Sequence, residues 1–308
     1  MKLLHQYTLQ SHPTILRLKV LAAIAVLSLL LAQSALAQTI RVGGKNFTEQ
    51  VLIAELTSQL LAAKGYNVTT RTGLSSSGIR LEQEAGLVDI YWEYTGTALT
   101  TFNNVVERLP PQEAFGRVRD LDGRKGLIWL APSKVNNTFA FAMRRSDAEG
   151  KGIASISDLA AAARRGERIR LACTTEFFIR PDGLIPMERA YGFGFAGQDI
   201  TRIEPGAVYA LLRDEQTDVG LVFATDGQIH SLNLLVLTDD RGFFPSYLLA
   251  PVVRKGVLDR NPELATHLET LAERLDNVTI AGLNAEVDVQ NKPVREVASS
   301  FLKSQGLL

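Results

Sequence analysis

The sequence predicts an α/β protein of two lobes, each a mainly parallel sheet flanked by helices. Segments typical of strands alternate with segments typical of helices from residue 39 to residue 94, and the alternation resumes from residue 156 to residue 237. Once a predicted export signal is removed, about 270 residues remain, more than one hydrophobic core usually holds. The two observations together favour two lobes.

The first predicted strand covers residues 39–44, and a helix follows it. Asn46 is expected to cap this helix, with Glu49 three positions later completing a capping box. Gly65 is expected to end it. Apolar residues spaced for one buried helix face lie between these signals: Leu52, Ile53, Leu56 and Leu60.

A second strand at residues 67–71, a short helix at 79–85 and a strand opening at Val88 follow. Strand–helix–strand–helix–strand in so short a stretch predicts parallel pairing with right-handed crossovers. The second alternation predicts strands at 169–173, 219–224 and 234–237 and helices at 156–165, 184–191 and 207–214.

The rest of the chain is expected to return to the first lobe. Residues 248–253 are typical of a strand, and a helix start at Asn261 and Pro262 opens a helical region that runs to Leu308. The expected division is a signal peptide at 1–37, a first lobe of 38–138 plus 247–308, and a second lobe of 139–246. The chain is expected to cross between the lobes near 138–143 and 238–247.

One stretch, Asp89 to Thr97, combines a buried strand with a sharp turn. Its aromatic residues end at Thr95 and Gly96, small residues that let a backbone turn and approach another group closely. Tyr94 lies at the carboxyl end of the strand, where open parallel sheets bind ligands. We expect Tyr94 to contact a ligand; for Tyr91 and Trp92, filling the core is an equally good interpretation.

The first residues have the pattern of a secretory signal peptide. Cationic residues precede an apolar run from Val20 to Ala32, and Ala35 and Ala37 occupy the positions of an A-x-A cleavage site. No cysteine for a lipid anchor stands at the site. We therefore expect an unlipidated protein exported to the periplasm.

Composition argues against several function classes. The predicted mature chain has 30 Lys and Arg against 33 Asp and Glu, a net charge of −3, because the signal carries three of the 33 basic residues and no acidic one. This excludes a strongly basic surface for nucleic acid. Cys173 is the only cysteine, and no zinc, P-loop, dinucleotide or serine-hydrolase motif occurs. We expect no enzyme activity, metal or cofactor.

Six motifs in order along the chain resemble one family. They are K-N-F-T-E-Q at 45–50, E-Y-T-G-T at 93–97, N-N-T-F-A at 136–140, E-F-F-I-R-P-D-G at 176–183, F-A-T-D-G at 223–227 and D-D-R-G-F-F-P-S-Y at 239–247. The family is the substrate-binding proteins of osmoprotectant ABC importers, which capture glycine betaine, choline, carnitine and related quaternary amines. The resemblance covers essentially the whole mature chain and implies the two-lobed clamshell of periplasmic binding proteins.

The resemblance also implies a ligand site. A trimethylammonium group has no N–H to donate, so aromatic faces must hold it. The family's cage positions fall on Tyr94, Phe139, Phe223 and Tyr247. The positions that hold a ligand carboxylate fall on Lys45, Thr97 and Arg180, and Asn137 would offer backbone to the methyl groups.

Each assignment has a structural alternative. Phe139 and Phe223 lie in apolar strands and would fill the core, and Tyr247 would pack at a hinge. Lys45 would be solvated at a strand end, and Arg180 would pair with Glu176 or Asp182. The family often has Tyr at positions 139 and 223, so the ligand cage is expected to be weaker or more permissive.

The resemblance therefore implies a monomeric periplasmic protein that traps a quaternary-ammonium osmolyte and delivers it to a membrane permease coupled to an ATPase. The alternatives are a binding protein for another small solute, such as ectoine, proline betaine or an amino acid, a receptor without transport, and a secreted hydrolase.

Overall fold

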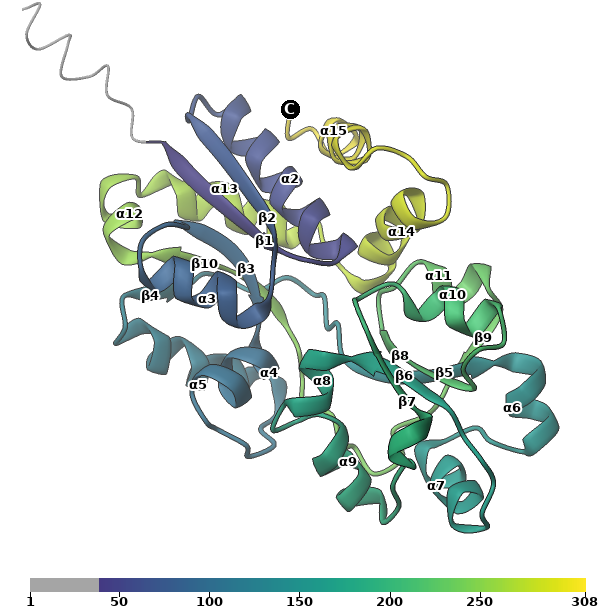
Figure 1. Ribbon diagram of the computed structural model, residues 1–308. Helices are drawn as coiled ribbons and strands as arrows, with labels where there is room; N and C mark the ends of the chain where they lie inside the picture. Colours follow the sequence, from purple (N-terminus) through teal and green to yellow (C-terminus); the bar gives the residue numbers. More distant parts are fainter. Residues whose placement is uncertain (1–38) are drawn as a thin grey trace, which may run out of the picture. The chain divides into compact units, whose positions relative to one another are not determined.

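The computed structural model describes residues 39–308. The predicted signal peptide, residues 1–37, lies outside the described residues. Residues 40–308 form one compact unit that contains two five-stranded sheets, seen in Figure 1 with separate sets of helices. None of the helices described is long and apolar enough to cross a membrane.

The first sheet has the strand order β2-β1-β3-β10-β4. Its strands are β1 (Ile40–Lys45), β2 (Val68–Leu74), β3 (Ile90–Tyr94), β4 (Leu127–Trp129) and β10 (Leu249–Arg254). β1 pairs in parallel with β2 and β3, as the alternation predicted, whereas β10 runs antiparallel to β3 and β4. Residues 248–253 were expected to form a strand, and β10 covers nearly the same residues. Its antiparallel direction was not predicted, because it depends on how the chain returns from the second sheet.

Helices cover this sheet from both ends of the sequence. The first group is α2 (Thr48–Ala63), α3 (Ser76–Glu84), α4 (Thr95–Thr97), the π-helix η1 (Ala98–Phe102) and α5 (Pro111–Gly123). The second is α12 (Lys255–Arg260), α13 (Glu263–Glu273), α14 (Asn277–Asp288) and α15 (Val294–Ser304). Helices α13, α14 and α15 all pack against α2. Because β3 is covered on both faces and paired on both edges, all five of its residues are buried.

The second sheet repeats the same plan with the order β7-β6-β8-β5-β9. Its strands are β5 (Phe139–Arg144), β6 (Leu171–Thr174), β7 (Ile200–Ile203), β8 (Val219–Phe223) and β9 (Leu234–Val236). Its helices are α6 (Arg145–Lys151), α7 (Ile156–Arg164), α8 (Thr175–Ile179), α9 (Leu184–Tyr191), the 3-10 helix η2 (Gly197–Asp199), α10 (Val208–Arg213) and α11 (Gln228–Ser231). Only β5 runs against the other four strands.

Two segments carry the chain between the sheets, residues 130–138 and 237–248, and they lie side by side. The backbone N–H of Asn137 donates to the carbonyl of Tyr247 at 3.2 Å, and the Asn136 side chain accepts from the Tyr247 N–H at 2.7 Å. The two sheets are therefore connected by a pair of segments that are hydrogen-bonded to each other.

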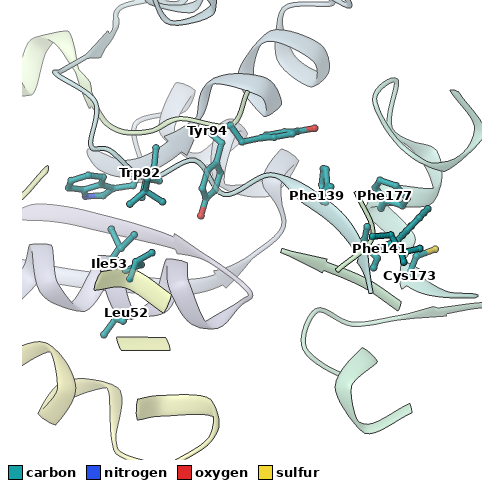
Figure 2. Close-up of a cluster of buried hydrophobic side chains, with 14 of the residues drawn as sticks. Leu52, Ile53, Trp92, Tyr94, Phe139, Phe141, Cys173 and Phe177 are labelled. Carbon is teal, nitrogen blue, oxygen red and sulfur yellow. The ribbon is translucent and has the colours of Figure 1, made fainter. Parts of the chain in front are cut away.

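One continuous apolar cluster runs through both sheets. Figure 2 shows Leu52, Ile53, Trp92 and Tyr94 on the elements of the first sheet, and Phe139, Phe141, Cys173 and Phe177 on those of the second. Trp92 is buried, and its indole N–H donates to Thr57 at 2.9 Å, so its polar atom has a partner in the core. Tyr91 and Trp92 are thus core residues.

The predicted capping box at the start of α2 is wrong. The residue that precedes the helix is Phe47, which makes no side-chain cap, and Glu49 is turned into the protein. The predicted helix start at Asn261 is displaced by one residue, because Pro262 directly precedes α13 and Asn261 is the C-cap of α12.

Gly96 is required because the backbone after β3 passes close to a ring. A Cβ at this position would lie 2.6 Å from two ring carbons of Tyr247 and 2.9 Å from the Ser246 carbonyl oxygen. Gly96 was expected to let the backbone approach another group closely, and that group is the Tyr247 ring. Neither the ring nor the backbone can move without disturbing the crossing segment.

We expect Gly96→Ala to lower the free energy of unfolding by about 1–3 kcal/mol, the usual cost of overpacking. Gly116→Ala is the control, because a Cβ there meets nothing within 4 Å in the middle of α5, and alanine should raise helix stability by about 0.5–1 kcal/mol. Urea unfolding measures both. Equal stability of the two variants would show that the Gly96 contact is not tight.

Candidate functional site

A cavity of about 300 Å³ lies between the elements of the two sheets, within the size range of small-molecule sites. All eight residues predicted to contact the ligand line it: Lys45, Tyr94, Thr97, Asn137, Phe139, Arg180, Phe223 and Tyr247. They come from strand ends of both sheets, from α4, from the turn after α8 and from both crossing segments. The cavity therefore collects residues that are far apart in sequence.

The aromatic rings of the cavity lie next to one another. The Phe139 ring centroid is 5.3 Å from that of Phe223 and 5.2 Å from that of Tyr247, whose plane is nearly perpendicular. Tyr94 joins the group through Phe47, which is 6.3 Å from it and stacks on Phe223 at 5.2 Å. Phe47 was missed in the sequence, although it stands inside the K-N-F-T-E-Q motif.

Glu49 lies at the hydroxyl end of the Tyr94 side chain and is only 1% exposed. One carboxylate oxygen accepts the Tyr94 hydroxyl at 2.7 Å and the Asn137 amide at 3.0 Å. The other accepts from the Thr225 hydroxyl and, at 3.5 Å, from the Asn284 amide. These donors are all neutral, and burial raises the pKa of Glu49 above its ordinary value.

The second buried carboxylate, Asp182, lies at the hydroxyl end of the Tyr247 side chain. It accepts the Tyr247 hydroxyl at 2.5 Å and the Thr100 hydroxyl at 2.9 Å. Arg180 binds it through two parallel hydrogen bonds of 2.7 Å each. Burial opposes ionisation, but the guanidinium outweighs it and lowers the pKa of Asp182. The structural pairing considered for Arg180 is therefore present.

Arg180 also reaches across the cavity. Its Nη1 donates to Glu176 at 3.0 Å and to Thr97 at 3.3 Å, and its Nη2 lies 3.4 Å from the Thr100 hydroxyl. Thr97 and Thr100 belong to the first sheet's elements, whereas Arg180 follows α8 of the second. The guanidinium thus connects the two sides of the cavity.

Lys45 is buried and paired rather than solvated. Its ammonium donates to Glu93 at 2.6 Å and lies 5.0 Å from the centroid of the Tyr94 ring. The guanidinium of Arg180 lies 5.2 Å from the Phe139 centroid. The Arg180 guanidinium also lies 6.0 Å from the Tyr247 centroid, so the structure already places cations against three of the rings.

Carboxylates outnumber cations around the cavity. The cations are Lys45 and Arg180, and the carboxylates that line the cavity or bind its walls are Glu49, Glu93, Glu176, Asp182 and Glu204. A site with rings and an excess of negative charge suits a cationic or zwitterionic molecule. In the described part of the chain, no group of three or more His, Cys, Asp or Glu is placed to hold a metal ion.

The fold and the site define a class: two α/β lobes joined by paired crossing segments, with a small-molecule cavity between their sheets. The chain belongs to the family described as the substrate binding domain of the ABC-type glycine betaine transport system, whose model matches residues 38–304. It is therefore the solute-binding component of an ABC importer, works outside the cytoplasmic membrane with a permease and an ATPase, and is not an enzyme.

Individual relatives agree with this family. The chain is 44% identical to the glycine-betaine-binding protein of Pseudomonas aeruginosa, over 92% of this chain and 94% of that one. It is 33% identical to the glycine betaine-binding protein YehZ of Escherichia coli, over 88% and 92%. A solved structure titled a glycine betaine/carnitine/choline ABC transporter matches with a TM-score of 0.71 and 26% identity, over 87% of this chain and 99% of that one. The predicted clamshell fold is confirmed.

The buried charge of Glu49 leads to a prediction about pH. Because its pKa is raised in the folded state, the folded protein holds this proton more tightly than the unfolded chain does. The stability associated with Glu49 is therefore greatest at low pH and falls as the pH rises past its ordinary value of 4.5. Glu49→Gln removes this fall, so the variant should gain stability relative to the natural protein as the pH rises above about 5.

The matched control is Asp158, a carboxylate whose pKa is shifted in the opposite direction. In Asp158, the hydrogen bond from Ser155 lowers the pKa, so its stabilising effect is lost as the pH falls and Asp158→Asn should be most harmful at neutral pH. Urea unfolding of the three proteins from about pH 3 to about pH 8 measures both trends, because the Asp158 effect is lost below its ordinary pKa of 3.8 and the Glu49 effect is lost above 4.5. A constant difference between Glu49→Gln and the natural protein would contradict the account of Glu49.

Proposed function

We propose that this protein captures a quaternary-ammonium osmolyte, glycine betaine or a choline-like molecule, and delivers it to the permease. The observation that carries the proposal is the cavity wall, in which rings from both sheets face a region with more carboxylates than cations. The names of the two relatives, both glycine betaine-binding proteins, support it.

The rings would hold the ligand's cation. Tyr94, Phe139, Phe223 and Tyr247 would form the cage, with Phe47 as a further wall, at about 0.5–2 kcal/mol for each cation–π contact. Phe139 and Phe223 have no hydroxyl, so only the two tyrosine rings are fixed by hydrogen bonds from their own side chains to carboxylates. This difference supports a cage that accepts several methylated amines.

The polar residues would orient the rest of the ligand. Lys45, Thr97 and Arg180 would face a ligand carboxylate, and Asn137 would place backbone near the methyl groups. Both cations are already paired with protein carboxylates. A ligand carboxylate must therefore share or replace these partners rather than meet a free charge.

The paired crossing segments support a hinge. The proposed lobes are residues 38–138 plus 247–308 and residues 139–246, with the boundaries at the crossings. Ligand contacts from both lobes would favour the closed form, because they exist together only when the lobes meet. The permease would then recognise the closed face of a periplasmic monomer that is exported by a cleaved signal, has no lipid anchor and does not bind nucleic acid.

Calorimetric titration with a graded ligand panel tests the proposal. Choline should bind, whereas 3,3-dimethyl-1-butanol, which has the same shape with carbon in place of the charged nitrogen, should bind at least about tenfold more weakly. In the series glycine betaine, dimethylglycine, glycine, affinity should fall as methyl groups are replaced by N–H.

The panel also includes ectoine, proline betaine and the common amino acids, which represent the alternative of another small solute. Tight binding of a ligand without a quaternary nitrogen, together with no binding of choline or glycine betaine, would contradict the proposal. Equal binding of choline and its neutral analogue would show that the rings act only as an apolar surface.

A further inference from the structure

Glu176 lines the cavity but was not among the residues predicted to contact a ligand. It lies in the short helix α8, and its side chain is 39% exposed. Its carboxylate accepts from Arg180 Nη1 at 3.0 Å and is hydrogen-bonded by the side chain of Ser76, the first residue of α3. Glu176 therefore links the elements of the two sheets across the cavity.

The surroundings of this carboxylate are those of a carboxylate-binding site. Burial raises the pKa of Glu176, but the positive charges of Lys45 and Arg180 and the hydrogen bond from Ser76 outweigh it, and the pKa is lowered overall. The two cations are the residues proposed for a ligand carboxylate. Glu176 thus already takes an Arg180 hydrogen bond that a ligand carboxylate would use.

Arg180 has no spare capacity for a second carboxylate. Two of its five N–H groups are used by Asp182, and the others are directed at Glu176, Thr97 and Thr100. A ligand carboxylate must therefore displace one of these partners. Asp182 is held by two parallel bonds and by two further hydroxyl groups, including that of Tyr247.

Glu176 is the partner that is easiest to displace. It accepts one hydrogen bond from Arg180, whereas Asp182 accepts two, and its side chain is the more exposed of the two. Once displaced, its negative charge would still lie near the ligand carboxylate, and two like charges at close range repel.

We propose that Glu176 is a specificity-determining residue whose carboxylate occupies the position of a ligand carboxylate, between Arg180 and Ser76, and so disfavours zwitterionic betaines relative to hydroxyl-bearing quaternary cations. This inference rests on the proposed function, because it assumes that such cations enter the cavity. A ligand such as choline leaves the Arg180–Glu176 pair in place and benefits from its negative charge.

The test compares glycine betaine and choline by calorimetry on the natural protein and on Glu176→Gln, at one pH and one salt concentration. The glutamine keeps the size of the side chain and removes its charge. The ratio of association constants, glycine betaine over choline, should rise by about tenfold. Ser76→Ala, which removes only the second partner of Glu176, should shift the ratio in the same direction by a smaller factor.

Glu204→Gln is the matched control. Glu204 is another carboxylate of the same cavity, but it accepts from Asn46 at 3.2 Å at an exposed position. It should leave the ratio unchanged. An unchanged ratio in Glu176→Gln, or an equal loss for both ligands, would overturn the inference while the proposed function stands. Absence of binding to the natural protein would instead overturn the proposed function.

Discussion

Rings can surround a cation only if they are held facing the cavity, and in this protein buried carboxylates hold them. Three walls are fixed in this way: Tyr94 by Glu49, Tyr247 by Asp182, and Phe223, through its backbone N–H, by Asp226. Burial raises the pKa of both tyrosines well above the ordinary value, so they remain neutral donors. Asp182, whose pKa is lowered, also places a negative charge beside the hydroxyl of Tyr247, which favours a cation in the cavity.

These carboxylates also connect the two sheets. Glu49 lies in α2, which covers the first sheet, and its carboxylate accepts a hydrogen bond from the Thr225 hydroxyl. Thr225 lies two residues after the end of β8, a strand of the second sheet. Asp182 accepts from Thr100 on the other side. Because the ring supports and the contacts between the sheets share the same acceptors, an opening of the cavity would disturb both together. This arrangement suits a protein that must hold its ligand firmly when closed and lose all the ligand contacts together when it opens.

Local sequence patterns predicted most strands and helices, because periodicity and glycine positions report burial and turns within one element. They also placed Tyr94 at the end of β3. They failed where a residue's partner is distant in sequence. Glu49 has the spacing of a capping box, but its carboxylate accepts hydrogen bonds from four donors outside α2. The antiparallel direction of β10 depends on how the chain returns to the first sheet, which no local pattern encodes.

A crystal structure of the protein with bound choline tests the central claim most directly. The account predicts that the quaternary nitrogen lies within about 6 Å of ring centroids contributed by both sheets, among them Tyr94 or Tyr247 from the first sheet's side and Phe139 or Phe223 from the second. A choline whose nitrogen lies at the exposed edge beside Glu204, with the rings packed only against one another, would contradict it.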